Sequence, residues 1–208
     1  MSNPWLTIPL ADYEGHMSLP SIDQAKMLAD RFELLIERTT PSSVAIIGCA
    51  GGNGLERLAS RQIERIVGVD INPEYIEEAR TRHATRLPHL ELYCADVQSD
   101  LLQFGPVDLI YAALLFEYVD TPSAIATLRR NCQRNGTLAT LLQLPNSTRP
   151  AVSSSPYASL NALAPAIRLL APDALCGFAA AAGFATADSE VIELASGKQF
   201  CLQTFRAC

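Results

Sequence analysis

Two features of the sequence have the chemistry to hold a nucleoside: a glycine-rich segment and an aspartate that follows it. Residues 48–54 read Gly-Cys-Ala-Gly-Gly-Asn-Gly and come directly after the apolar run 44–47. Glycine presents no Cβ and tolerates positive φ, so such a turn lets a ligand approach the main chain closely. Asp70 ends the next apolar run, where a carboxylate can accept two hydrogen bonds from a ribose diol. Together they indicate an adenosine-type cofactor.

The spacing of the glycines discriminates between such cofactors. A dinucleotide-binding turn reads G-x-G-x-x-G, and in this chain Cys49 and Ala50 stand where the central glycine of that string is needed. A nicotinamide- or flavin-dependent oxidoreductase on a similar sheet stays open as an alternative. It predicts that the final strands of the sheet are parallel.

The elements that must position these residues follow from the apolar pattern. Strands are expected at residues 44–47, 66–69, 90–94, 107–111 and 137–142. Helices are expected to open at residues 55–60 and at Pro73, and a third should be capped by Thr121 before Pro122. Strands that alternate with helices at this spacing predict a parallel, doubly wound sheet.

The two ends of the chain depart from this alternation. The spacing of apolar residues predicts an amphipathic helix over residues 21–38. Residues 13–17, which precede it, are either a lid over the site or an ordinary loop. Near the carboxyl end, a helix over residues 172–182 is expected to precede strands at 187–194 and 199–206. The short glycine-containing link between these strands predicts an antiparallel hairpin.

The expected fold is therefore α/β, with a doubly wound, mostly parallel seven-stranded sheet and a C-terminal antiparallel hairpin. A chain of 208 residues is long enough to bury such a core without disulfides or metals. We expect one domain, residues 1–208, in three parts. These are an N-terminal helical cap or lid (1–40), a cofactor-binding core (41–144) and a substrate-side loop, helix and terminal hairpin (145–208).

Composition and charge restrict the partners. The formal net charge of -6 disfavours sequence-independent binding of nucleic acid, which requires clustered Lys and Arg. No apolar run reaches the roughly 20 residues that span a bilayer, and the N-terminus lacks the pattern of a signal peptide. We therefore expect no nucleic-acid or membrane partner and a cytoplasmic location. The six scattered cysteines show no metal-ligand spacing, so they are expected to be reduced and no metal site is expected.

Six segments follow one another in a characteristic order: residues 48–56, 68–73, 95–97, 107–111, 115–119 and 181–184. In order and spacing they resemble the class I S-adenosylmethionine-dependent methyltransferases. Each segment alone is unspecific, whereas the whole series is specific and extends over most of the chain. The resemblance implies a Rossmann-like methyltransferase fold, S-adenosylmethionine as cofactor and methyl transfer as the activity.

The resemblance also implies which residues hold the methionine half of the cofactor. Gly48, Cys49, Ala50 and Gly51 would line it. Asn53 would lie at the mouth of the helix that follows.

For the nucleoside half, the resemblance implies that Asp70 holds the ribose hydroxyls and that Ile71 lies against the adenine. Asp96 would receive the adenine amino group, and Val97 would add a main-chain contact. Both acids have a simpler alternative, because aspartate is a common helix cap. Asp70 would then cap the helix that begins near residue 73, and Asp96 a helical turn at residues 97–102.

The transfer end of the site follows the fourth strand. The resemblance places Ala112 and Leu114 beside the sulfonium, with Glu117 and Tyr118 as candidates for the acceptor pocket. The chain departs from the family at Ile46, where the family commonly has an acid that contacts the cofactor's ammonium group. This contact must be missing or supplied by another residue.

These features favour methylation of a small molecule at O, N or C. No catalytic residue is assigned, because positioning can supply much of the acceleration of methyl transfer. A general base is needed only when the nucleophile keeps a proton. A non-catalytic protein that keeps the fold and binds the cofactor is a further alternative. The acceptor and the oligomeric state do not follow from the sequence.

Overall fold

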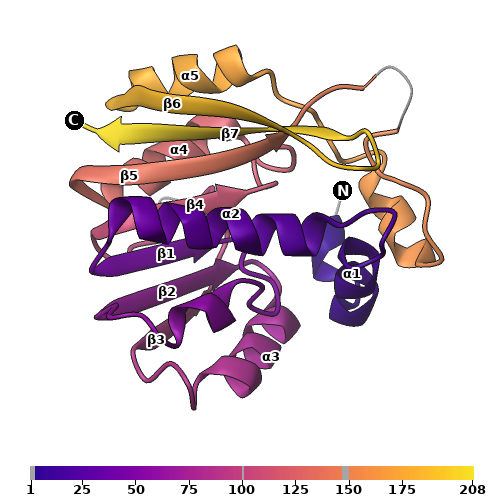
Figure 1. Cartoon of the computed structure of the whole chain (residues 1–208), viewed down its shortest axis with the longest axis horizontal. Coiled ribbons are helices and arrows are strands. Elements are labelled where there is room, and N and C mark those ends of the chain that lie inside the picture. The colour runs from indigo at the N-terminus through magenta and orange to yellow at the C-terminus, as the bar shows by residue number, and fades with distance from the viewer. Residues whose placement is uncertain (1–2, 100, 147–149) are drawn as a thin grey trace.

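The computed structural model describes residues 3–99, 101–146 and 150–208, and their central feature is one seven-stranded sheet (Figure 1). Its strands are β1 (Ser43–Ile47), β2 (Arg65–Asp70), β3 (Leu90–Cys94), β4 (Val107–Ala113), β5 (Cys132–Gln143), β6 (Phe184–Glu193) and β7 (Gln199–Ala207). They are ordered β3-β2-β1-β4-β5-β7-β6. The first five are parallel, whereas β7 is antiparallel to both β5 and β6. The predicted mixed sheet with a terminal hairpin is confirmed.

Helices cover both faces of this sheet. They are α1 (Leu10–Met17), α2 (Gln24–Thr39), α3 (Pro73–His83), α4 (Thr121–Arg130) and α5 (Pro172–Ala181), with short 3-10 helices η1 (Pro4–Leu6), η2 (Leu55–Leu58) and η3 (Ala158–Leu163). Figure 1 shows α2 crossing in front of the sheet and α4 behind it. Among the described residues, no helix is both long and apolar enough to span a membrane.

The core is divided by the sheet into two layers, as the alternation along β1 shows. Val44 and Ile46 belong to the cluster under α2, which includes Phe32. Ala45 and Ile47 belong to the cluster on the opposite face, which includes side chains of α4 and α5. Successive side chains of a strand point to opposite faces. A wholly apolar strand therefore contributes to both layers of a doubly wound fold.

The helix expected to open at residues 55–60 begins at Leu55 as predicted, but it is a 3-10 helix of four residues, η2. A longer α-helix does not form before β2 begins at Arg65. The sheet at this position is covered instead by α2, to which η2 is attached.

Two further expectations are corrected near the helix ends. Asp120, not Thr121, caps α4, since its side chain accepts from the main-chain N–H of Ser123. The segment at residues 13–17 is not an ordinary loop but part of the helix α1. This helix packs beside η3, a contact between chain segments far apart in sequence.

Candidate active site

The glycine-rich turn is fastened to the neighbouring strand β2. The main-chain N–H groups of Gly48 and Cys49 both donate to the carbonyl of Val69, at 2.8 and 3.1 Å. Gly48 has a φ of +73°, and a Cβ built on it would approach only Leu115, at 3.6 Å. Such a Cβ would project into open space above the turn, which is therefore available to a ligand.

Asp70 ends β2 next to this turn and is tied to it. Its Oδ2 accepts from the N–H of Ala50 and its Oδ1 from the N–H of Asn72, each at 2.9 Å. Burial raises the pKa of Asp70, and these main-chain hydrogen bonds act against that rise. Asn72, not Asp70, caps α3 by accepting from Glu74 and Tyr75, so the capping alternative for Asp70 was wrong. Each carboxylate oxygen retains a further lone pair for a ligand.

Ala50 adopts a left-handed conformation with φ of +47°, which is unfavourable for any residue with a Cβ by roughly 1–2 kcal/mol. We therefore expect Ala50→Gly to raise the free energy of unfolding by about 0.5–1 kcal/mol, measured by urea denaturation. Ala45, in the middle of β1 and outside the positive-φ residues, is the matched control. Ala45→Gly should lower stability. If Ala50→Gly and Ala45→Gly changed the free energy of unfolding in the same direction, this interpretation of Ala50 would be contradicted.

A pocket lies at the carboxyl edge of the sheet, where β1, β2, β3 and β4 end, and we call it the first pocket. Its empty space, including the open mouth, is about 700 Å³. Of the residues expected at the cofactor, those that line it are Gly48, Ala50, Asp70, Ile71, Asp96, Val97 and Leu114. The sequence pattern thus brings seven predicted residues from four different segments to one cavity.

The other four predicted residues lie around this pocket without lining it. Cys49 is buried, and its Sγ would be 3.2 Å from a Cβ at Gly68. Burial, and then the charge of Asp70, raises the pKa of the Cys49 thiol, so it acts as a packing residue. Ala112 is fully buried, and its neighbour Ala113 lines the pocket instead, because adjacent residues of a strand face opposite sides.

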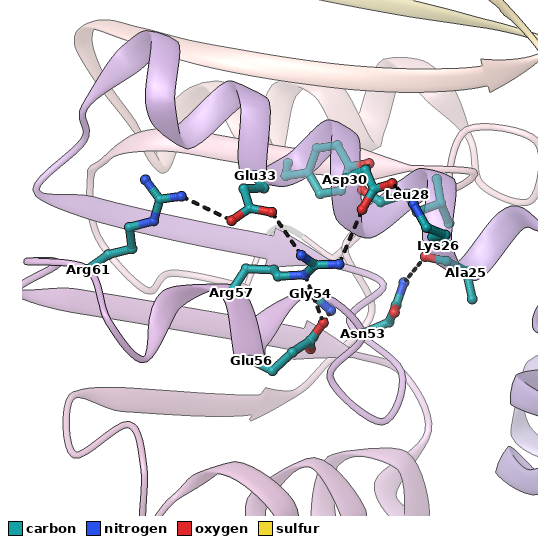
Figure 2. Close-up of polar contacts among 11 residues, drawn as sticks. Ala25, Lys26, Leu28, Asp30, Glu33, Asn53, Gly54, Glu56, Arg57 and Arg61 are labelled. Atoms are coloured by element: carbon teal, nitrogen blue, oxygen red, sulfur yellow. Dashed lines mark hydrogen bonds and ion pairs between the residues drawn. The ribbon is translucent and has the colours of Figure 1, made fainter.

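Asn53 and Gly51 lie on the outer side of the turn. Figure 2 shows the amide of Asn53 directed toward α2, where it donates to the carbonyl of Ala25 at 3.1 Å. On η2, Arg57 pairs with both Asp30 and Glu33 of α2 (Figure 2). These contacts hold the glycine-rich turn against α2. The inner side of the turn faces the first pocket.

Asp96, after β3, has both a structural contact and a place in the first pocket. Its carboxylate accepts from the main-chain N–H of Gln98 at 2.9 Å and from the side-chain amide of the same residue. The segment that follows forms a turn rather than a helix over residues 97–99, and residue 100 lies outside the described residues. Gln98 also lines the pocket, which the sequence did not indicate.

Three aromatic side chains line the first pocket, and we call Trp5, Tyr13 and Tyr118 the aromatic wall. The Trp5 ring lies edge-on to both partners, with centroids 5.4 Å from Tyr13 and 5.1 Å from Tyr118. The amide of Asn72 fixes this segment by donating to the carbonyl of Trp5 at 2.8 Å. No pattern in the sequence indicated Trp5, because only this tertiary contact brings it to the site.

A second pocket adjoins the first and shares with it the aromatic wall and Leu114. Its empty space is about 550 Å³, and its other lining residues are His16, Met17, Gln24, Glu117, Gln143, Ala151, Val152, Leu160, Leu163, Ile167 and Lys198. Leu114 has a φ of +53°, an unusual conformation for a bulky residue that is often found at functional sites. Two cavities thus meet at the carboxyl edge of the sheet.

Residues 44–136 match a protein family described as a methyltransferase domain. This part of the chain is thus similar to methyltransferase domains, in agreement with the resemblance in the sequence. The match begins in β1, includes the glycine-rich turn, Asp70 and Asp96, and ends in β5. It therefore contains most of the elements that form the first pocket.

Known proteins agree with this assignment. A trans-aconitate 2-methyltransferase of Methylobacterium nodulans is 30% identical over 140 residues, which are 66% of this chain and 52% of that protein. The chain thus spans about half the length of the curated relatives it matches.

Among solved structures, the N-methyltransferase NodS of Bradyrhizobium japonicum has a TM-score of 0.65 at 19% identity, covering 92% of this chain and 98% of that one. Magnesium protoporphyrin IX methyltransferase of Synechocystis, solved with bound SAH, has a TM-score of 0.67 at 15% identity, covering 88% and 82%. These two likenesses show the shared fold. With the antiparallel β6–β7 pair, they disfavour the oxidoreductase alternative.

The departure from the family pattern at Ile46 remains in the folded structure. Ile46 is buried under α2 and offers no charge to the turn. A carboxylate from α1 lies beside the turn instead, since Oε1 of Glu14 would be 2.4 Å from a Cβ at Gly51. The same oxygen accepts from Arg82 at 2.6 Å.

Proposed function

We propose that this chain is an S-adenosylmethionine-dependent methyltransferase, which binds its cofactor in the first pocket and a small-molecule acceptor in the second. The observation that carries the proposal is the junction of two cavities at the carboxyl edge of the sheet, with Leu114 and the aromatic wall common to both. Methyl transfer requires donor and acceptor to be in contact and in line. Adjoining cavities with a common wall meet that requirement.

The residues of the first pocket fit the proposed cofactor. Gly48 leaves the space that a Cβ would fill, which suits close approach of the methionine half to the main chain. Asp70 has a lone pair on each oxygen beyond its main-chain bonds, which suits two ribose hydroxyls. The half-buried Asp96 can accept from the adenine amino group, with Ile71 and Val97 as apolar contacts.

The remaining residues from the sequence prediction have supporting roles in this proposal. Cys49 and Ala112 would hold the turn and β4 in place from the core, and Gly51 and Asn53 would connect the turn to the helices outside it.

The chain's own contribution to the reaction would be orientation and exclusion of water. The cofactor, when bound, supplies an electrophilic methyl group on a sulfonium. Leu114 and the aromatic wall would surround the transfer path with apolar surface, and aromatic faces attract cations. In this scheme residues 1–40 form the cap, 41–144 the cofactor core and 145–208 the acceptor side of one domain.

A small acceptor is supported by the name of the curated relative, trans-aconitate 2-methyltransferase. The net charge of -6 argues against nucleic acid as the acceptor. A cytoplasmic location and the lack of a membrane partner belong to the same proposal.

Calorimetric titration with S-adenosylhomocysteine and, separately, with NAD tests the cofactor. We expect binding of the first ligand only, and binding of NAD alone would refute the proposal. Incubation with methyl-labelled S-adenosylmethionine and a small-molecule extract then tests catalysis. Label in a small product is expected, whereas tight cofactor binding without any labelled product would support the non-catalytic alternative.

A further inference from the structure

Two buried polar atoms in the second pocket have no hydrogen-bond partner within the described chain. They are Oε2 of Glu117 and Nδ1 of His16, on side chains that are 1% and 7% exposed. A buried polar atom without a partner is unfavourable, and native structures contain few of them. Both residues line the same cavity. The pair therefore marks positions where a ligand can supply the missing partners.

Glu117 is held so that only one of its oxygens is occupied. Its Oε1 accepts from the main-chain N–H of Gln143 at 2.7 Å, at the end of β5. Its own main-chain carbonyl accepts from the N–H of Arg168 at 2.8 Å, which fixes the turn after β4. The carboxyl group is thus oriented by two segments of the fold, with Oε2 left for a ligand.

We propose that the second pocket takes an uncharged molecule bearing a hydroxyl group, an alcohol or a phenol, and that Oε2 of Glu117 receives the hydroxyl proton during methyl transfer. This inference rests on the proposed function, because it assigns the acceptor of that same site. Leu114 and Tyr118, which lie close to Glu117 in sequence, line both pockets. A hydroxyl that reaches Glu117 is therefore beside the wall common to the two cavities.

Proton transfer and methyl transfer involve only the acceptor hydroxyl, Glu117 and the methyl sulfonium of the cofactor. The O–H bond of the acceptor breaks and its proton passes to Oε2 of Glu117. The electron pair left on that oxygen forms the new bond to the methyl carbon. The electron pair of the broken carbon–sulfur bond stays on sulfur, and the protonated Glu117 later loses its proton to water.

The charges around the pocket support an uncharged acceptor. Burial raises the pKa of Glu117 to about 7, so near neutral pH it can accept a proton from a hydroxyl. A carboxylate acceptor is already ionised at that pH and needs no base. The negative charge of such an acceptor would also be repelled by the negative charge of ionised Glu117.

The other titratable groups facing this cavity are His16, Lys198 and the phenols of Tyr13 and Tyr118. Burial, and then the charge of Lys198, lowers the pKa of His16, so its ring is neutral and can bind a second polar group of the acceptor. Burial raises the pKa of both phenols. The Lys198 ammonium donates to Oε1 of Gln143 at 3.3 Å and to the carbonyl of Ala151 at 2.6 Å, which ties its charge to the pocket wall.

Phenol and benzoate, which differ in the group offered to Glu117, are suitable probes. Trp5 is the only tryptophan of the chain and lines both pockets, so its fluorescence reports on either. The protein is first titrated with S-adenosylhomocysteine and then, when saturated, with each probe between about pH 5.5 and about pH 8.5, on either side of the group's titration. The variant is Glu117→Gln. The control is Glu64→Gln, which replaces an exposed glutamate distant from Glu117 in the sequence.

We expect phenol to bind about fivefold to tenfold more tightly at the higher pH, because its O–H then donates to a carboxylate instead of a carboxylic acid. Benzoate should bind more weakly as the pH rises. Both trends should vanish in Glu117→Gln and persist in Glu64→Gln. The opposite trends of the two probes in the unmodified protein test the proposal even where the variant folds poorly.

Three results overturn the proposal: phenol affinity that does not change with pH, a pH trend that survives in Glu117→Gln, or benzoate that binds more tightly as the pH rises. Any of these together with normal binding of S-adenosylhomocysteine overturns only the acceptor assignment. Failure of S-adenosylhomocysteine to bind overturns the proposed function itself, and this inference with it.

Discussion

Replacing Asp70 with alanine is expected to lower the affinity for S-adenosylhomocysteine by at least about 100-fold. Two hydrogen bonds from ribose hydroxyls to a carboxylate are each worth roughly 1.5–3 kcal/mol, and their combined loss corresponds to a factor of this size or larger. Asp70 also accepts from the N–H groups of Ala50 and Asn72, so the variant loosens the turn as well. Calorimetric titration measures the affinity.

Asp108 provides a matched control for the loss of main-chain contacts. Its Oδ2 accepts from the N–H groups of Ser42 and Ser43, at 3.0 and 2.9 Å, at the opposite edge of the sheet. Asp108→Ala should therefore lower stability while leaving the affinity for S-adenosylhomocysteine unchanged. If Asp70→Ala kept its affinity, or if both variants lost it equally, Asp70 would not be the ribose ligand.

Stability should fall between about pH 5 and about pH 8 by roughly 2–3 kcal/mol more in the unmodified protein than in Glu117→Gln. Burial raises the pKa of Glu117 from 4.5 to about 7. Between these two values the native state binds more protons at this group than the unfolded state does. Stability therefore decreases as the pH rises through this window and is constant, with respect to this group, above it.

Urea denaturation of both proteins at the two pH values measures this difference. His16, whose pKa is lowered by burial, acts in the opposite direction but equally in both proteins, so it cancels. Glu64→Gln, at an exposed position, should behave as the unmodified protein does. Parallel pH curves for the unmodified protein and Glu117→Gln would show that Glu117 is not desolvated in the native state.

Much of the fold could be predicted because the determining signals are local. Four features show this: the apolar runs that became β1 and β2, the glycines after β1, and Asp70 at the tip of β2. Each is recognised from a few consecutive residues. Parallel strands bring their carboxyl ends to one edge, so four such segments necessarily meet there. The antiparallel β6–β7 pair likewise follows from the short glycine-containing link between its strands.

Errors arose where a local signal competed with its tertiary surroundings. Residues after the glycine-rich turn have helical character, yet only the 3-10 helix η2 forms, because β2 begins soon after it, at Arg65. Ala112 was expected at the site, but the pleat of β4 turns Ala113 to the pocket instead. A shift by one residue reverses the face of a strand, and sequence boundaries are not that precise.

By itself the sequence determined the sheet, the glycine-rich turn and the acids at the strand tips, since each depends on backbone geometry that short segments encode. Only the tertiary structure decided that Trp5 reaches the site through Asn72 and that α1 and η3 enclose a second pocket. It also decided that Oε2 of Glu117 is left without a partner in that pocket. These features depend on contacts between distant segments, which become favourable only when the whole core packs and water is excluded.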